Sequence, residues 1–234
     1  MSDQKSTVTF NPDQLRAEAA VRKAAKAGNP EAQFRLGVMY GNGDGVGLDY
    51  AQAREWFERA AAQGHENALI TLAWMYANGT GIEVDETRAR ELYLQAAKRG
   101  SAKAQYVVGT MYRFAQYGAS RDIPAAVQWY LKAADQGMPT AQFALGKMLM
   151  EGKGVARDDA AALQWLSLAH VNGSKRAEDY VKHQVPSPSP FMRGGGDLEG
   201  RKDPRRVFSP SDHFHRIGEC SPHRTLVQTH TSQG

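Results

Sequence analysis

The stretch NPEAQFRLGVMYGNGDGVGLDYAQAREWFERAAAQG, residues 29–64, decides the fold because three similar stretches follow it along the chain. A glycine ends each stretch, and the intervals between these glycines are 36, 36, 37 and 36 residues. The marker glycines are Gly28, Gly64, Gly100, Gly137 and Gly173. A fixed period of roughly 20–50 residues is typical of a solenoid, in which one supersecondary unit stacks on the next.

Each unit contains two apolar patterns with helical spacing. In the first unit the earlier pattern consists of Ala32, Leu36, Met39 and Tyr40. The later pattern consists of Ala53, Trp56, Phe57, Ala60 and Ala61. Both sets fall on a single face of a helix, so each unit is predicted to contain two amphipathic helices, A and B.

The predicted helices have clear start and stop signals. Asn29 with Pro30 is a typical helix start, and Ser101 is the equivalent residue two units later. An aspartate precedes every helix B and is expected to cap it; these aspartates are Asp49, Asp85, Asp122 and Asp158. The periodic glycine is expected to end helix B in the left-handed conformation.

A small residue in the middle of helix A indicates how the two helices pack. Gly37, Gly109 and Gly146 occupy this position in three of the four units. A glycine inside a helix costs about 1 kcal/mol relative to alanine. We therefore expect helix B to approach closely here, at its alanine pairs, and each unit to be an antiparallel helical hairpin.

The combined pattern, A-x-x-x-L-G-x-x-Y…G-x-G-V…D…A-x-x-W-x-x-x-A-A-x-x-G, resembles the Sel-one-like repeat family, whose members are relatives of the tetratricopeptide repeat. The resemblance covers four full units, near residues 29–64, 65–100, 101–137 and 138–173. It implies an all-α fold, a right-handed α/α superhelix of helical hairpins. Departures are Ala73 for glycine, Leu92 for tryptophan, Leu149 for tyrosine and a longer third loop at Arg113–Arg121.

The domain organisation follows from where the pattern begins and ends. We predict a flexible N-terminus at 1–13 and a solenoid over 14–183 with a partial unit at each end. An abbreviated final helix is expected to start at Ser174 and to end near Lys182. Residues 184–234 contain 6 Pro, 6 Gly and 6 Ser and few aliphatic residues, so we predict a disordered tail.

Composition restricts the class of protein. The net charge is +4, with 7 Lys/Arg against 5 Asp/Glu in the last 51 residues, which is too balanced to indicate nucleic-acid binding. The chain has one cysteine, Cys220, no apolar run of membrane-spanning length and no apolar run of signal-peptide length at its start. We therefore expect a cytoplasmic protein without disulfides.

Motifs that suggest chemistry have simpler explanations. The glycine-rich loop at 41–47 lacks the phosphate-binding lysine motif and follows a helix rather than a strand. The four periodic aspartates lie a repeat apart, which is too far for paired-acid catalysis. The methionines at 39, 75, 111 and 148 are expected in the core. His213, His215, Cys220 and His223 are zinc-ligand types, but their spacing fits no zinc-finger pattern. We expect no metal, no cofactor and no catalytic residue.

The resemblance implies a non-catalytic adaptor that binds another protein. One rival is a β-lactamase-like hydrolase, as described for cysteine-rich relatives, but their cysteine pairs are absent from every unit here. A second rival, nucleic-acid binding, rests only on Arg201, Lys202, Arg205 and Arg206.

The binding face is predicted from the positions that vary between units. Phe34, Ile70, Tyr106 and Phe143 are apolar in every unit and are assigned to packing. In tetratricopeptide relatives helix A lines the concave surface, so resemblance places the variable stripe of helix A in a groove. The predicted groove residues are Arg35, Val38, Thr71, Trp74, Val107, Thr110, Phe114 and Lys147. Trp74 has two interpretations, a contact for the partner or a filler of the space left by Leu92.

Overall fold

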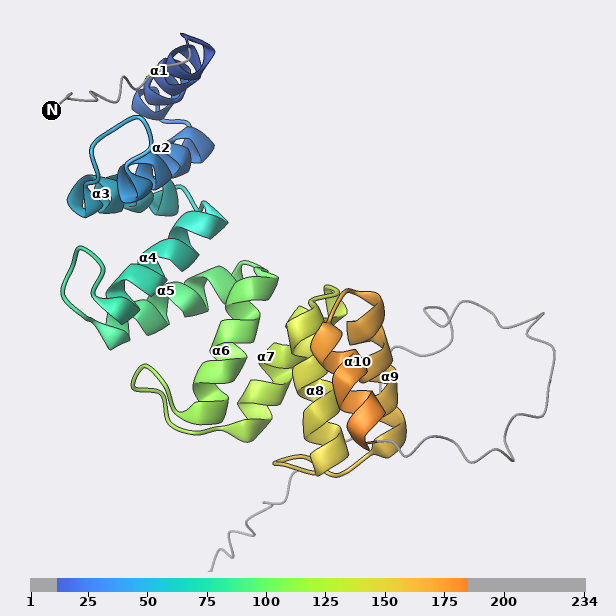
Figure 1. Cartoon of the computed structure of the whole chain (residues 1–234). Helices are drawn as coiled ribbons and strands as arrows, with labels where there is room; N and C mark the ends of the chain where they lie inside the picture. The colour runs from blue at the N-terminus through green and yellow to red at the C-terminus, as the bar shows by residue number, and fades with distance from the viewer. Residues whose placement is uncertain (1–11, 185–234) are drawn as a thin grey trace, which may run out of the picture.

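The described part of the computed structural model, residues 12–184, is a chain of helical hairpins (Figure 1). Its helices are α1 (Pro12–Lys26), α2 (Pro30–Asn42), α3 (Tyr50–Ala62), α4 (Glu66–Asn78), α5 (Glu86–Lys98), α6 (Ala102–Phe114), α7 (Ile123–Asp135), α8 (Pro139–Glu151), α9 (Asp159–Val171) and α10 (Lys175–Gln184). Strands are absent from residues 12–184. The all-α solenoid predicted from the period is therefore confirmed.

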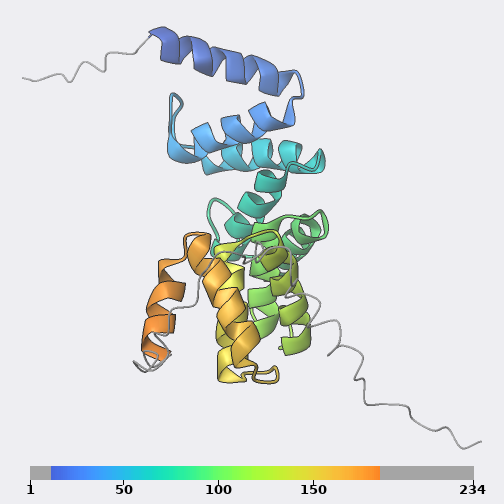
Figure 2. The same ribbon diagram turned by 90° about the vertical axis from the view of Figure 1, so that its right-hand side faces the viewer.

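The hairpins follow one another in chain order from α1 at one end to α10 at the other (Figures 1 and 2). Helices α2, α4, α6 and α8 are helix A of units one to four, and α3, α5, α7 and α9 are helix B. Helix α1 lies in the partial unit predicted before unit one, and α10 matches the abbreviated final helix. Each helix packs mainly on its neighbours in the chain, as a quasi-one-dimensional array requires.

The predicted caps form. The carboxylate of Asp49 accepts a hydrogen bond from the backbone N–H of Gln52 at 3.0 Å, and Asp85, Asp122 and Asp158 make the equivalent bond at 2.8, 2.9 and 2.9 Å. Asn29 and Ser101 cap α2 and α6 in the same way. Each such cap stabilises its helix by about 1 kcal/mol, so a structural role explains all four aspartates.

The periodic glycine has the conformation predicted for it. Gly64 has φ +84°, and its N–H donates to the carbonyl of Ala61 at 2.8 Å. The next N–H, of His65, donates to the carbonyl of Ala60 at 3.0 Å. This pair of bonds is a Schellman motif, and it reverses the chain from helix B into the next unit.

The small position of helix A lies at a close helix contact, as predicted. A Cβ on Gly109 would stand 2.7 Å from Cδ1 of Tyr130 and 3.1 Å from the carbonyl oxygen of Ala126. The alanine pairs of helix B were the wrong partner, because the ring or branched side chain at Phe57, Tyr130 or Leu166 faces the glycine instead. In these three units the two helices thus meet at a bulky side chain that lies where a Cβ would stand.

The buried residues of the described chain form four apolar clusters, and partly buried residues such as Tyr40, Tyr112 and Met150 each pack against two of them. One apolar cluster extends from Ala53 to Met111 and includes residues of α3, α4, α5 and α6. Met75, Met111 and Met148 are buried as expected, while Met39 is partly buried. Of the invariantly apolar positions, Phe34 and Tyr106 pack on Phe57 and Tyr130 with ring centroids 5.5 Å apart. Their assignment to packing fits these contacts.

Helix α1 begins at Pro12, inside the segment predicted to be flexible; the remainder of that segment, the predicted tail and the histidine–cysteine group lie outside the described residues.

In the third loop Ala115 and Tyr117 have φ +54° and +52°, where other units have glycine. A left-handed non-glycine residue costs about 1–2 kcal/mol. Arg90 holds this loop by donating to the carbonyl of Tyr117 at 2.8 Å.

Candidate partner-binding groove

The predicted groove residues lie on helix A of successive units, and the structure brings only some of them together. Three hollows lie along these helices, and their linings decide which residues form a site. Val38, Thr71 and Trp74 line the first hollow, and Thr71, Trp74 and Val107 line the second. Phe114 lines the third.

Trp74 is the central residue of the predicted set. Its side chain is 50% exposed, and it lines both the first and the second hollow. Leu92, which stands where the other units have tryptophan, is only 6% exposed, while half of the Trp74 side chain is exposed. Exposure of a large aromatic side chain between two apolar hollows fits a contact residue better than a core filler.

The first hollow lies where units one and two meet. It has a volume of about 170 Å³, and its lining includes Val38, Tyr50, Phe57, Trp74 and Met75. Apart from Tyr50, the polar side chains in the lining are those of Asn42, Thr71 and Thr80, which are short and carry no charge. A hollow of this size and lining suits one apolar side chain.

The second hollow, between units two and three, is larger and contains a charge. It has a volume of about 420 Å³ and is lined by Ile70, Thr71, Trp74, Tyr93, Lys103, Tyr106, Val107 and Met138. Burial and, to a smaller extent, Tyr117 raise the pKa of Tyr93 to about 12, so its hydroxyl is protonated at neutral pH. Lys103 is the one basic side chain in this lining, which contains no acidic side chain.

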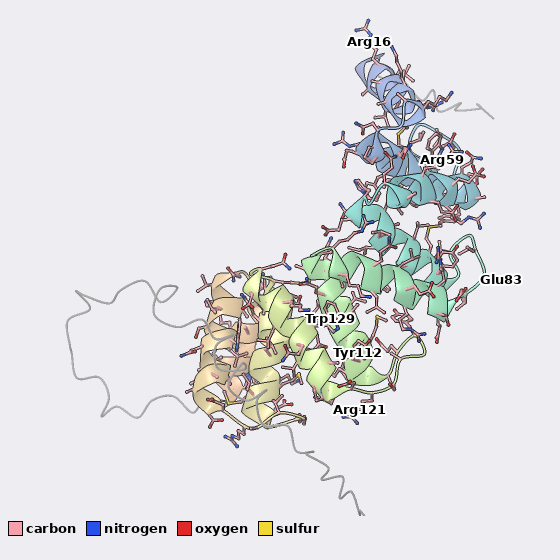
Figure 3. All side chains as sticks on the ribbon, turned by 180° about the vertical axis from the view of Figure 1, so that it is seen from behind. Arg16, Arg59, Glu83, Tyr112, Arg121 and Trp129 are labelled. Atoms are coloured by element: carbon pink, nitrogen blue, oxygen red, sulfur yellow. The ribbon has the colours of Figure 1, made fainter. Side chains whose placement is uncertain are left out.

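The third hollow lies between the loop of unit three and the loop of unit four. It has a volume of about 620 Å³ and is lined by Arg113, Phe114, Arg121, Ile123, Lys153 and Gly154. The Arg113 guanidinium lies 5.0 Å from the centre of the Phe114 ring. Phe114 is 58% exposed, and Arg121 lies on the loop that leads into α7 (Figure 3). The hollow is therefore strongly cationic, with one exposed aromatic ring.

Three predicted groove residues form contacts within the chain instead. The side chain of Arg35 pairs with Glu31 at 2.8 Å, and Lys147 lies 3.8 Å from Glu151. The hydroxyl of Thr110 lies 3.0 Å from the carbonyl of Tyr106 and 3.1 Å from the hydroxyl of Tyr130. None of these three belongs to the linings of the three hollows described above.

Sequence reasoning missed Lys103, Arg113 and Arg121. Lys103 precedes Val107 by four residues and occupies the same helical face, where the other units have Glu31, Asn67 and Thr140. This variation from unit to unit is the signal that could have identified it. Arg113 and Arg121 flank the longer third loop, whose conformation the sequence left open.

The linings of the three hollows share one chemical feature. Their linings contain apolar side chains, hydroxyls, one amide and basic groups, but no histidine or carboxylate. Within residues 12–184, no three histidine, cysteine or acidic side chains lie close enough to hold a metal ion. No helix in the same part of the chain is long and apolar enough to cross a membrane.

Comparison with known proteins agrees with this geometry. The Sel1 repeat model matches residues 30–65, 67–101, 102–138 and 139–169. The chain belongs to the Sel1 repeat family. Sel1 repeats commonly build scaffolds for protein interaction and are generally non-catalytic.

Two solved structures of Sel1-type proteins are similar to this chain. A Sel1 repeat protein from Oxalobacter formigenes is 36% identical over 74% of this chain, with a TM-score of 0.68. The protein c5321, a protective antigen of uropathogenic Escherichia coli strains with an SLR fold, is 36% identical over 71%, with a TM-score of 0.67. This chain spans only 50% and 35% of their respective lengths. Among curated proteins there is no significant match.

Proposed function

We propose that this Sel1 repeat protein is a non-catalytic adaptor that binds a segment of another protein along helix A of its units, with Trp74 as the central contact. The observation that carries the proposal is the half-exposed indole between two apolar hollows. Aromatic side chains that are exposed in the free protein and buried by a partner dominate binding energy at interfaces.

The dimensions of the site support a peptide segment rather than a small molecule. The hollows lie on both sides of one residue and involve α2, α4 and α6, so a ligand that fills both must be extended. An extended peptide places alternate side chains on one side at a spacing of about 6–7 Å. Two apolar side chains of one segment can therefore occupy hollows on either side of Trp74.

The rival functions have weaker support. A hydrolase needs an activated nucleophile, and the hollow linings contain no histidine or carboxylate to act as its base. The cysteine pairs of hydrolase-like relatives are absent, since Cys220 is the only cysteine of the chain. Nucleic-acid binding rests on basic residues outside the described part. We place the adaptor in the cytoplasm, where a chain with one cysteine suits reducing conditions.

The test is a selection of binders from a phage-displayed library of random dodecapeptides on the immobilised full chain. Enriched peptides are then measured against Trp74→Ala by fluorescence polarisation. We expect Trp74→Ala to weaken binding about 30-fold, because a central aromatic contact contributes about 2 kcal/mol.

The matched control is Trp129→Ala. Trp129 is also partly buried, but it lies on helix B (Figure 3), with Lys132 Nζ 4.3 Å from its ring and outside the three hollows. Its removal should leave peptide affinity within about threefold as long as circular dichroism shows a folded array. Enrichment of no peptide, or equal losses with both variants, contradicts the proposal.

A further inference from the structure

The third unit has an unbalanced group of cations along its helix A. Lys103 lies in the second hollow, and Arg113 and Arg121 lie in the third. None of these three side chains forms an ion pair with a carboxylate of residues 12–184. Lys153, the remaining cation of the third hollow, lies 3.0 Å from Glu151.

The other units neutralise the corresponding surface. In unit one Glu31 occupies the position of Lys103 and pairs with Arg35 at 2.8 Å. In unit four Lys147 and Glu151 lie 3.8 Å apart. Only in unit three does the stripe of helix A have cations at both ends without acidic partners in the described chain.

One helical face connects the two cationic ends. Lys103, Val107, Thr110 and Phe114 are spaced by four, three and four residues on α6, so they lie in one row. Eleven residues of helix correspond to about 16 Å, the length of about five residues of extended chain. A single short segment can therefore reach from the second hollow to the third.

The backbone beside the third hollow is strained, which is a second observation in favour of a site. Ala115 and Tyr117 follow Phe114 with positive φ, and Arg90 and Tyr93 contact Tyr117 to hold the loop in place. Strained residues of this kind occur preferentially at binding and switch regions. The strained loop joins Phe114 to Arg121, two residues of the cationic hollow.

We propose that the bound segment continues from the second hollow along α6 to the third, and that this part of the partner protein is acidic, with carboxylates at both ends and an apolar side chain between them. This inference rests on the proposed function, since it names the chemistry of the same partner. One carboxylate pairs with Lys103 beside Trp74, and another meets Arg121 and Arg113, whose planar guanidinium groups bind carboxylates in bidentate geometry. The apolar side chain lies against Val107, Trp74 and Tyr106.

Charge also argues against a segment of the same chain as the occupant. Residues 185–234 contain 7 Lys/Arg and 5 Asp/Glu, so this segment does not complement a cationic surface. An acidic partner gains attraction at both ends of the row, and it also gains in association rate by electrostatic steering.

The experiment uses the dodecapeptide library and the full chain described above. We expect the enriched peptides to carry a net negative charge, with an apolar residue between acidic positions. Lys103→Glu and Arg121→Glu should each weaken the affinity of an enriched peptide about fivefold to tenfold at low salt and less at about 0.15 M salt. Lys175→Glu, on α10, makes the same charge change far from α6 and should alter affinity less than about twofold.

The outcomes separate this inference from the proposed function. Neutral or basic enriched peptides that depend on Trp74 but not on Lys103 and Arg121 overturn the acidic segment and leave the adaptor intact. An absence of enriched peptides overturns the adaptor itself. A dimer in sedimentation that dissociates with Lys103→Glu assigns the surface to a second copy and also overturns the inference. Acidic peptides that lose affinity with both charge reversals, and not with Lys175→Glu, support it.

Discussion

Unit two differs from its neighbours both in its interior and on its surface. In the interior two hydrogen-bonded partners are replaced, and on the surface a variable position of helix A is occupied by tryptophan. In units one, three and four a buried glutamine near the start of helix A joins three helices. Its Nε2 donates to the last turn of the preceding helix B, as Gln105 does to the carbonyl of Ala97 at 3.2 Å. Its Oε1 accepts from a residue at the end of helix B in its own unit, as Gln105 does from Gln136 at 2.8 Å.

This pair of hydrogen bonds, which we call the clamp, is also present in units one and four. Gln33 donates to Ala25 and accepts from Gln63, while Gln142 donates to Ala134 and accepts from Asn172. Unit two has Leu69 and Arg99 at these positions. Both partners have changed together, because a glutamine left alone in the interior would cost about 1–3 kcal/mol in unsatisfied hydrogen bonding.

The variable stripe of helix A also differs in unit two. Trp74 stands on α4 where the other units have Val38, Thr110 and Lys147, and in the same unit Leu92 stands in the interior where the other units have tryptophan. In unit two both ends of the clamp are replaced by residues that cannot form its hydrogen bond, whereas the position of Trp74 has a different residue in every unit. This difference is the reason to assign the stripe of helix A to partner binding and the clamp to the stability of the array.

The largest effect is expected from the small position of helix A. Gly109→Leu should destabilise the fold by about 3 kcal/mol, because a Cβ there already stands 2.7 Å from Tyr130 and 3.1 Å from a carbonyl oxygen. Ala73→Gly, the reverse change in unit two, should cost only about 1 kcal/mol from helix propensity. Urea unfolding followed by circular dichroism compares the two; equal and small losses would mean that unit three can relax as unit two does.

The next effect concerns the clamp. Gln105→Leu should cost about 2 kcal/mol, because it removes two hydrogen bonds, each of which contributes about 1 kcal/mol. The carbonyl of Ala97 keeps the N–H of Gly100, and Gln136 Nε2 keeps the carbonyl of Gly100. Adding Gln136→Arg reproduces the pair of unit two and should recover part of this loss. A double-mutant cycle in urea measures the coupling. Additive losses would show that Leu69 and Arg99 do not act as a pair.

The hairpins and their caps could be predicted from the sequence because local chemistry determines them. Asp49 and its equivalents cap because a carboxylate before an apolar helical pattern has one favourable partner, and Gly64 ends helix B because the chain there needs positive φ. The position of Trp74 on the variable face followed from spacing alone. Its exposure did not, since that depends on how far apart α2, α4 and α6 are held.

The clamp and the cationic hollow could not be predicted because they join residues of different helices. Gln105 contacts a residue 31 positions away, and the sequence does not show which glutamine is buried. The joint change to Leu69 and Arg99 was visible in the aligned units and could have indicated a contact. Arg113 and Arg121 come together through a loop whose conformation is unusual for non-glycine residues, so its path could not be predicted from turn rules.

The smallest effect is expected at the junction of units one and two, where His65 takes the cap position held by Asn29 in unit one. Its Nδ1 accepts from the N–H of Ala68 at 3.2 Å, so Nε2 donates to Glu31, 3.0 Å away. Hydrogen bonds from His65 and then from Arg35 lower the pKa of Glu31 below its ordinary value of 4.5. Ionised Glu31 therefore stabilises the fold above that value, and the contribution is lost as the pH falls through the lowered pKa.

Glu31→Gln keeps an acceptor for His65 but removes the titration. Because the Glu31 side chain is 55% exposed and screened by solvent, we expect the variant to lose less than about 0.5 kcal/mol at about pH 7 and less again at about pH 3. Glu66→Gln, in the first turn of α4, provides the control for the loss of a carboxylate near the same junction. Urea midpoints at the two pH values measure the difference. A gap between Glu31→Gln and the parent protein that widens in acid would mean that the charge of Glu31 opposes the junction instead of supporting it.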